Sequence, residues 1–91
     1  GQMNLACNQC HDHLAGKSLR AETISQGHLN GFPSYLLRWG VVASAHKRFQ
    51  FCNDQARAEP LEIGHSDYNA LQLYITWRGN GLLFESPSVR R

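Results

Sequence analysis

The feature that most constrains this chain is the run Cys7-Asn8-Gln9-Cys10-His11, which has the spacing C-x-x-C-H. That spacing is typical of covalent attachment of a c-type haem. Two thiols three positions apart can each form a thioether with one vinyl group of the porphyrin. The histidine after the second thiol is then held under the iron as its proximal ligand. The motif therefore predicts one covalent haem, attached through Cys7 and Cys10 and ligated by His11.

Three other uses of these cysteines fit the surrounding sequence less well. A thioredoxin-like dithiol follows a strand in a βαβ unit, and no alternating pattern precedes Cys7. A structural zinc site needs a second ligand pair at similar spacing, whereas Cys52 stands alone. A disulfide between Cys7 and Cys10 leaves Cys52 unpaired and gives His11 no role. Covalent haem is therefore our prediction, ahead of a redox dithiol, zinc or a disulfide.

The size and charge of the chain limit its architecture and its partners. Its 91 residues are enough for one small domain. Apolar residues make up 42% of the chain, at the low end for a soluble protein, and a covalent haem would add apolar volume and a covalent staple. The net charge is +2, and no apolar run reaches the length of a spanning helix. We expect no nucleic-acid partner and no membrane span.

The compartment follows from the haem chemistry, because thioether attachment belongs to the oxidising, extracytoplasmic side of the bacterial membrane. No signal peptide is visible, so we expect a mature periplasmic chain. Small c-type cytochromes usually carry a helix before the haem motif, and only six residues precede Cys7. We therefore interpret residues 1–91 as a single cytochrome c-like catalytic domain, the C-terminal part of a longer subunit or a proteolytic product.

Two apolar stripes predict helices that pack on the haem. Ser34 can cap the first, in which apolar residues recur at helical spacing from Tyr35 to Phe49, with Gly40 weakening its middle. The second begins after a cap at Ser66 and ends near Gly79 or Gly81. Turns, loops and a tail fill residues 16–20, 23–33, 55–64 and 86–91. The predicted fold class is all-α, a small cytochrome c-like domain wrapped around one covalent haem.

The group on the opposite face of the haem is a separate question. Methionine is the usual sixth ligand, but Met3 is the only methionine and lies four residues before Cys7. It belongs to the proximal segment and cannot swing across the haem. His13 is likewise too close to His11 to reach the opposite face. The remaining candidates are one cysteine and three histidines, namely Cys52, His28, His46 and His65.

Cys52 stands out because the haem thioethers do not use it. A leftover cysteine in an oxidising compartment is an intermolecular partner or a reactive thiol, and a thiolate is a strong iron ligand. Arg48 lies four residues earlier and shares its helical face. A neighbouring guanidinium lowers a thiol pKa and binds oxyanions. This pair predicts sulfur-oxyanion chemistry, and the alternative of a buried free cysteine beside a solvated arginine stays open.

Four stretches, in the same order and over nearly the whole chain, resemble blocks of the A subunit of the thiosulfate-oxidising SoxAX cytochromes. They are GQMNLACNQCHD (1–12), ETISQGHLNGFPSYLLRW (22–39), RFQFCNDQARAEP (48–60) and NALQLYITWRGNG (69–81). The resemblance implies the C-terminal haem domain of a periplasmic L-cysteine S-thiosulfotransferase. It implies His11 and Cys52 as the haem ligands, with Cys52 often a persulfide, and it implies substrate binding by Arg48.

The resemblance also implies a reaction and its partners. Thiosulfate would be joined to a cysteine of a SoxY-type sulfur carrier protein, with two electrons passing to haem iron, and the subunit would pair with a SoxX-type cytochrome subunit. Cys52 would be haem ligand and sulfur acceptor, and Arg48 would hold the dianion. Apart from the resemblance, Arg57 is a weaker candidate for the same anion site, and a surface position is favoured for it. The alternatives are a plain periplasmic electron-transfer cytochrome and a haem-bearing regulatory or docking domain.

Overall fold

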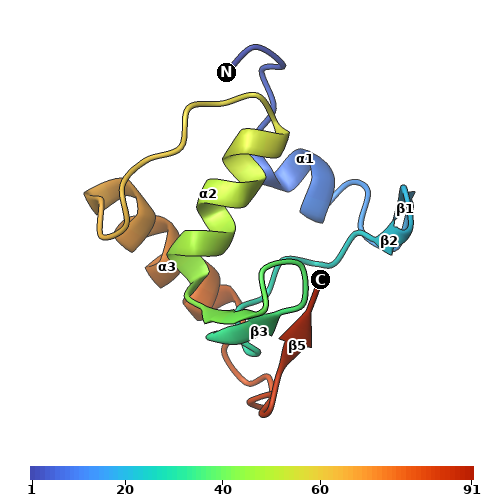
Figure 1. The fold of residues 1–91 in the computed structure, drawn as a ribbon, viewed down its shortest axis with the longest axis vertical. Helices are drawn as coiled ribbons and strands as arrows, with labels where there is room; N and C mark the ends of the chain where they lie inside the picture. The colour runs from blue at the N-terminus through green and yellow to red at the C-terminus, as the bar shows by residue number, and fades with distance from the viewer.

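The computed structural model describes all 91 residues as three helices and five strands. The helices are α1 (Cys7–His11), α2 (Ala45–Gln55) and α3 (Ser66–Arg78). The strands are β1 (Ser18–Leu19), β2 (Glu22–Thr23), β3 (Ser34–Leu36), β4 (Val41–Ala43) and β5 (Val89–Arg90). Figure 1 shows α2 in the centre of the molecule, with β3 and β5 below it. No helix has both the length and the apolar character needed to cross a bilayer.

The prediction of an all-α fold is wrong, because 32% of the residues are helical and 13% lie in strands. The strands form two sheets. β1 and β2 make a small antiparallel hairpin, and the larger sheet has the order β4-β3-β5. Within it, β3 is antiparallel to β4 and parallel to β5. The chain is therefore a mixed α/β fold.

The main error concerns the segment from Tyr35 to Phe49, which was predicted as one helix. Its first part is the β3–β4 hairpin, in which Leu36 pairs with Val41. Gly40 closes the turn with a φ of 65°, in the left-handed region that glycine adopts readily. β-Branched valines in β4 favour the strand. The apolar residues predicted to form one helical stripe thus belong to two structures, the β3–β4 hairpin and the helix α2 that follows it.

Both long helices begin at a side-chain cap. α2 follows Ser44, whose Oγ accepts a hydrogen bond from the backbone N–H of Lys47 at 3.3 Å. The second predicted helix is confirmed as α3, although its N-cap is His65 and not Ser66. The Nδ1 atom of His65 accepts a hydrogen bond from the backbone N–H of Asp67 at 3.0 Å. A histidine cap is uncommon, which is why the serine was the natural choice from sequence.

The predicted tail at residues 86–91 contains β5 and is tied to the sheet. Val89 pairs with Tyr35 in parallel register. Beneath that pair, the buried side-chain oxygens of Ser34 and Ser88 lie 3.2 Å apart and share a hydrogen bond. This pairing fixes the end of the described chain beside β3, and it carries Arg91 towards α2.

The hydrophobic core lies between α2 and α3. Ala45 and Phe49 of α2 pack there against Tyr68 and Ile75 of α3. Only ten of the 91 residues are buried, which is few even for a small domain. Many large apolar side chains are exposed instead, including several on α3. The hydrophobic core that the protein's own side chains form between α2 and α3 is therefore small.

Candidate haem and thiol site

The short helix α1 presents the two thiols of the C-x-x-C-H motif. It begins at Cys7, where the Oε1 atom of Gln9 accepts a hydrogen bond from the backbone N–H of Ala6 at 2.6 Å. Cys7 is exposed and Cys10 is half-buried, and neither is in a disulfide. The disulfide alternative is therefore not realised in this structure, and both thiols remain available for thioether bonds.

The imidazole of His11 is held in a defined orientation by the loop before β3. Its Nδ1 lies 2.9 Å from the carbonyl oxygen of Ser25. A carbonyl can only accept, so Nδ1 carries the proton and donates it, which leaves the lone pair on Nε2. Gly27 packs against the same ring, because a Cβ added there would lie 3.1 Å from the His11 Cγ. Sequence reasoning missed Ser25 and Gly27, although a glycine within an irregular loop indicates a close approach.

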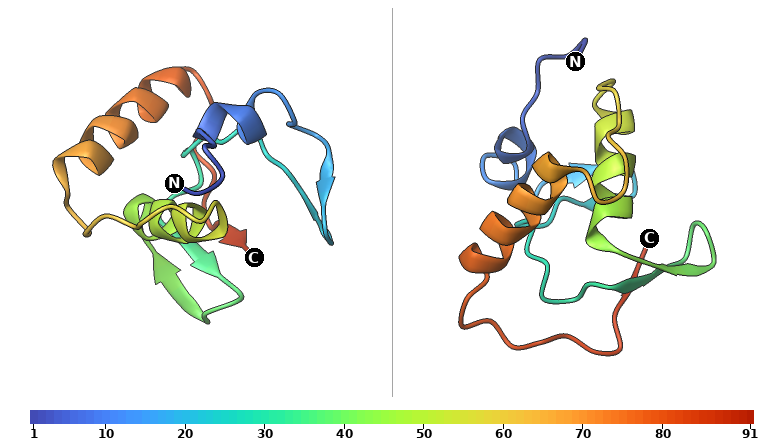
Figure 2. Two further views of the ribbon diagram at one scale, coloured as in Figure 1. Left: turned by 90° about the horizontal axis from the view of Figure 1, so that it is seen from above. Right: turned by 90° about the vertical axis from the view of Figure 1, so that its left-hand side faces the viewer.

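A cavity of about 380 Å³ opens between α1 and α3, which lie next to each other in Figure 2. The motif residues Cys7 and His11 line one side of it. Leu71 and Ile75 of α3 provide an apolar wall on the other. At the end of the wall, Arg78 of α3 also lines the cavity and forms an ion pair at 3.1 Å with Asp12, which follows α1.

The residues of this cavity fit a c-type haem. Cys7 and His11 line the cavity beside an apolar wall, and Cys10, on the same turn of α1, supplies the second free thiol from outside the lining. The zinc alternative needs several protein ligands in one place. His, Cys, Asp and Glu side chains form no group of three or more suited to a metal ion.

Cys52 lies on α2, half-buried, and near enough to Cys7 and Cys10 for their charge to affect the pKa of its thiol. Burial raises the pKa of its thiol, and this is the largest influence on that pKa. The charge of Arg48 and its hydrogen bonding towards the sulfur act in the opposite direction, while negative charge at Cys7 and Cys10 raises the pKa further. These charge effects act only over short distances. The structure therefore brings Cys52, Arg48 and the motif cysteines together.

The expectation that Arg48 would leave Cys52 with a lowered pKa is wrong in its net direction. The guanidinium does lower the pKa, but the burial of the sulfur outweighs it. A metal ion bound by the sulfur would displace the proton outright. Cys52 is thus a protonated thiol at neutral pH in the protein alone, and it needs a metal or a base before it can act as a thiolate.

Two contacts of its guanidinium group hold Arg48 in place. Its Nη1 donates a hydrogen bond to the carbonyl oxygen of Arg91 at 2.8 Å. Its Cζ lies 5.1 Å from the ring centroid of Phe51, within the range of a cation–π interaction. Arg38 approaches the same ring at 5.0 Å. Arg91, the residue after β5, and one aromatic ring therefore set the position of Arg48.

The histidines proposed as other ligands occupy separate places. His46 is buried in the core and stacks on Phe49 at 6.0 Å, and its Nδ1 accepts a hydrogen bond from the backbone N–H of Gly64 at 3.0 Å. His65 caps α3. His28 is half-buried, and its Nδ1 is buried without a hydrogen-bond partner.

Three further residues from the sequence analysis lie at the surface. Met3 and His13 are exposed. Arg57 is exposed just beyond the end of α2 and forms no ion pair. In contrast, Arg38 and Phe51 contact the cation–π cluster around Arg48. Sequence reasoning missed both because Arg38 belongs to a hairpin that it did not predict.

A C-x-x-C-H helix, an oriented imidazole and an apolar wall are typical of c-type cytochrome domains. No family model matches the chain. Its relatives include the "L-cysteine S-thiosulfotransferase subunit SoxA" of Pseudaminobacter salicylatoxidans, 45% identical over 91 residues, 100% of this chain and 32% of that protein. The subunit of the same name from Paracoccus pantotrophus is 44% identical over 90 residues, 99% of this chain and 31% of that protein.

The fold points to the same group of proteins. The crystal structure of SoxXA from P. pantotrophus matches with a TM-score of 0.94 and 44% identity, covering 100% of this chain and 34% of that one. Over its full length, the chain is homologous to SoxA subunits, and it spans about a third of the length of the curated relatives it matches. The predicted resemblance to the A subunit is confirmed.

Proposed function

We propose that residues 1–91 form the haem-bearing catalytic domain of a SoxA-type subunit, which transfers thiosulfate oxidatively to a thiol of a carrier protein. The observation that carries this proposal is that Arg48, Cys7 and Cys10 all influence the pKa of the Cys52 thiol, although α1 and α2 are far apart in the chain. Support also comes from the relatives, which are named subunits of an L-cysteine S-thiosulfotransferase.

The proposed cofactor is one haem c, attached through Cys7 and Cys10. His11 would ligate it through Nε2, the nitrogen left free by the hydrogen bond to Ser25. Cys52 would hold it from α2. When bound, such a group supplies an iron centre and an acceptor for single electrons.

Arg48 binds the substrate in this proposal. Thiosulfate is a dianion, and a guanidinium offers a planar fork of donors that matches two oxygens of a sulfonate end. One nitrogen of Arg48 already donates to the Arg91 carbonyl, and the ring of Phe51 supports the guanidinium. The remaining donors are therefore held in a fixed direction before the anion arrives.

Cys52 accepts the sulfur. The Cys52 thiol and the sulfane sulfur of thiosulfate form one sulfur–sulfur bond, with loss of one proton and two electrons to a cytochrome-class acceptor. A carrier thiolate then attacks the sulfane sulfur and releases Cys52 as a thiolate, so the sulfonate leaves on the carrier. Arg48 lowers the pKa of Cys52, which makes the sulfur a better leaving group.

The proposed partners and compartment follow from the same homology and chemistry. The SoxXA structure is a complex by its name, which supports a SoxX-type cytochrome subunit as partner. A SoxY-type carrier supplies the acceptor thiol. Thioether attachment of haem supports a periplasmic location. In that oxidising compartment the carrier thiol would need protection from unrelated oxidation.

The proposal is tested in the full-length, haem-loaded subunit paired with its partner. Thiosulfate-dependent modification of the carrier thiol is measured for wild type, Cys52→Ser, Arg48→Leu and the exposed control Arg57→Leu. We expect Cys52→Ser to abolish the modification, Arg48→Leu to raise the KM for thiosulfate at least tenfold, and Arg57→Leu to behave as wild type. Wild-type turnover in Cys52→Ser would contradict the proposal. Electron exchange with no sulfur product in wild type would favour the plain electron carrier.

A further inference from the structure

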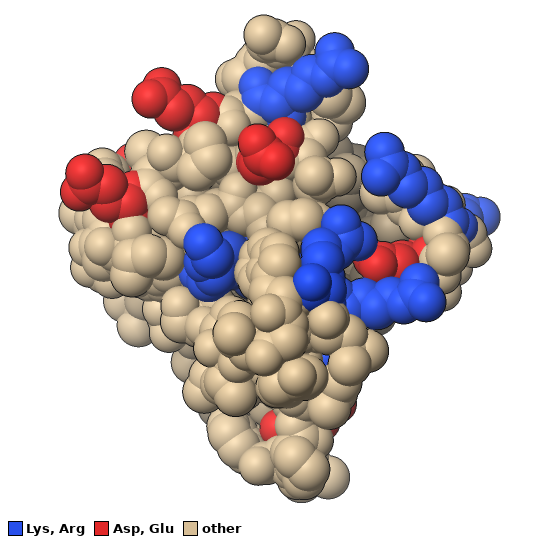
Figure 3. Space-filling view, viewed as in Figure 1, with Lys and Arg blue, Asp and Glu red and all other residues tan.

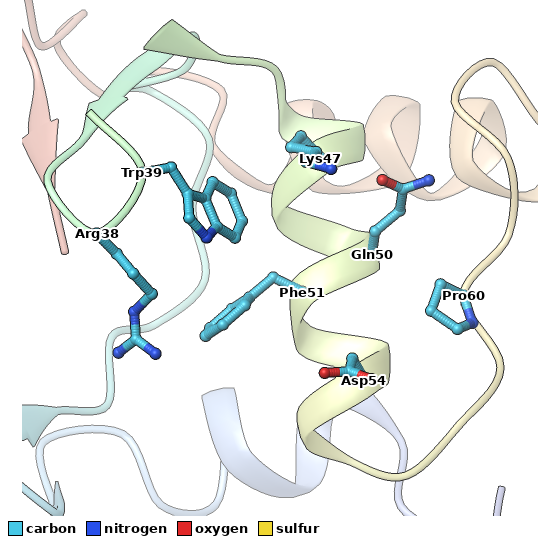
Figure 4. A pocket seen from close by; sticks show the side chains of 7 residues that line it. All are labelled: Arg38, Trp39, Lys47, Gln50, Phe51, Asp54 and Pro60. Atoms are coloured by element: carbon cyan, nitrogen blue, oxygen red, sulfur yellow. The ribbon is translucent and has the colours of Figure 1, made fainter. Parts of the chain in front are cut away.

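A groove of about 540 Å³ lies between the β3–β4 turn and α2, on the face of α2 shown in Figure 4. Arg38 and Trp39 of the turn form one side. Lys47 and Phe51 of α2 form the other, and Pro60 lies at the far end. We call this surface the basic groove. None of its residues belongs to the α1 cavity described above.

Aromatic rings hold the cations of the basic groove in place. Trp39 meets Phe51 edge to face at a centroid distance of 5.5 Å. The Lys47 Nζ lies 5.6 Å from the Trp39 ring, and the Arg38 guanidinium lies 5.0 Å from the Phe51 ring. In Figure 4, the side chains of Trp39 and Phe51 both point into the space between the turn and the helix. The charges are thus ordered on a rigid aromatic floor.

Charge is distributed unevenly along the basic groove, with its two cations near the turn and one carboxylate further along α2. Lys47 has no carboxylate within 4.0 Å, and Arg38 pairs only with Glu22, at 3.6 Å and largely in solvent. Asp54, at the end of the groove towards Pro60, forms no ion pair. Figure 3 shows Lys and Arg side chains gathered around one acidic group at the right of the molecule, with further acidic side chains at the left and near the top of the same face. Near the turn, Arg38 and Lys47 therefore place positive charge beside the apolar rings, whereas Asp54 places one negative charge further along α2.

The basic groove adjoins Arg48, one member of the candidate catalytic pair. Phe51 immediately precedes Cys52, and the Arg48 guanidinium lies 5.1 Å from the Phe51 ring. Cys52 is half-buried, so an acceptor thiol has to be brought to it by a chain that docks nearby. The groove is much larger than one small anion needs, and its apolar floor suits the side chains and backbone of an extended segment. The net charge of only +2 gives little attraction for nucleic acid.

We propose that the basic groove docks an acidic segment of the protein that bears the acceptor thiol, next to Cys52. This inference rests on the proposed function. Charge complementarity between Lys47, Arg38 and the segment's carboxylates would speed encounter and set its register. The rings of Trp39 and Phe51 would add apolar contact at the centre.

The probe is a short fluorescent peptide of alternating glutamate and glycine with one blocked cysteine, and its binding to the full-length haem-loaded subunit is followed by anisotropy. The control peptide has glutamine in place of glutamate. We expect the glutamate peptide to bind at least about tenfold more tightly than the control, with affinity falling as salt rises. We expect the double variant Arg38→Glu/Lys47→Glu to lose this preference and Arg38→Gln/Lys47→Gln to lose part of it.

A matched double variant, Lys17→Glu/Arg20→Glu, changes the net charge equally at the exposed β1–β2 hairpin and should bind as wild type. Equal binding of both peptides, or equal loss in the groove and hairpin variants, would overturn the docking proposal. Peptide binding uses no thiosulfate, so the two proposals fail separately. Peptide binding that is lost in Arg38→Glu/Lys47→Glu supports the docking site even if thiosulfate turnover is absent. Thiosulfate turnover by the wild type, together with unchanged peptide binding in Arg38→Glu/Lys47→Glu, overturns the docking site alone.

Discussion

Gly27 tests whether the loop before β3 positions the imidazole of His11, the proposed haem ligand. Its φ is +77°, and an added Cβ would lie 3.1 Å from the Cγ and 3.2 Å from the Cβ of His11. The left-handed conformation costs a non-glycine residue about 1–2 kcal/mol. Crowding of a packed contact adds about 1–3 kcal/mol. We therefore expect Gly27→Ala to lower the free energy of unfolding by about 2–5 kcal/mol.

Gly16 provides a matched control for the backbone term. Its φ is +85°, and an added Cβ would have no atom within 4 Å. Gly16→Ala should therefore cost only the conformational part, about 1–2 kcal/mol. Urea unfolding monitored by circular dichroism gives both values, and the absorption spectrum of the haem-loaded protein reports the His11 ligand. Equal costs and identical spectra for the two variants would refute the role of the Gly27 contact.

Three further predictions follow from the site and the core. Because the pKa of Cys52 is raised, the folded state binds the thiol proton more tightly than the unfolded state. The free energy of unfolding of the haem-free chain should therefore be highest below the ordinary thiol pKa and should fall as the pH rises towards the raised pKa of the folded state. Cys52→Ser should reduce this fall with pH in urea titrations, and an unchanged fall would contradict the assignment. Arg48→Leu should slow iodoacetamide labelling of Cys52 at alkaline pH by raising its pKa further, whereas faster labelling would count against the charge effect. His46→Ala removes a buried ring and the acceptor of the Gly64 N–H, so it should cost about 2–4 kcal/mol in the same assay, and a cost near zero would show that this core contact is dispensable.

Part of the fold was readable from local sequence, and part depended on pairing between distant segments. α3 was predictable because a long stripe with helical spacing ends at a glycine. The β3–β4 hairpin was not, because short apolar runs fit a period of two as well as one of 3.6. The parallel pairing of Tyr35 with Val89 joins segments more than fifty positions apart, and no local pattern reports such a contact.

The site shows the same division. The spacing of Arg48 and Cys52 predicted a shared helical face, and the structure places them together beside the motif cysteines. Arg57 is exposed beyond α2, as favoured from the sequence, and Arg38, which the sequence analysis did not consider, joins Arg48 at the Phe51 ring. The net rise in the Cys52 pKa was also out of reach, because burial depends on tertiary packing.

The most direct test of the central claim is peptide-mapped mass spectrometry of the full-length, haem-loaded subunit after incubation with thiosulfate and an electron acceptor. The account predicts a haem that survives denaturation on the peptide holding Cys7 and Cys10. It also predicts a sulfur-containing adduct on the Cys52 peptide that reduction removes. A Cys52 peptide that remains unmodified while thiosulfate is consumed, or a motif peptide without haem, would contradict it.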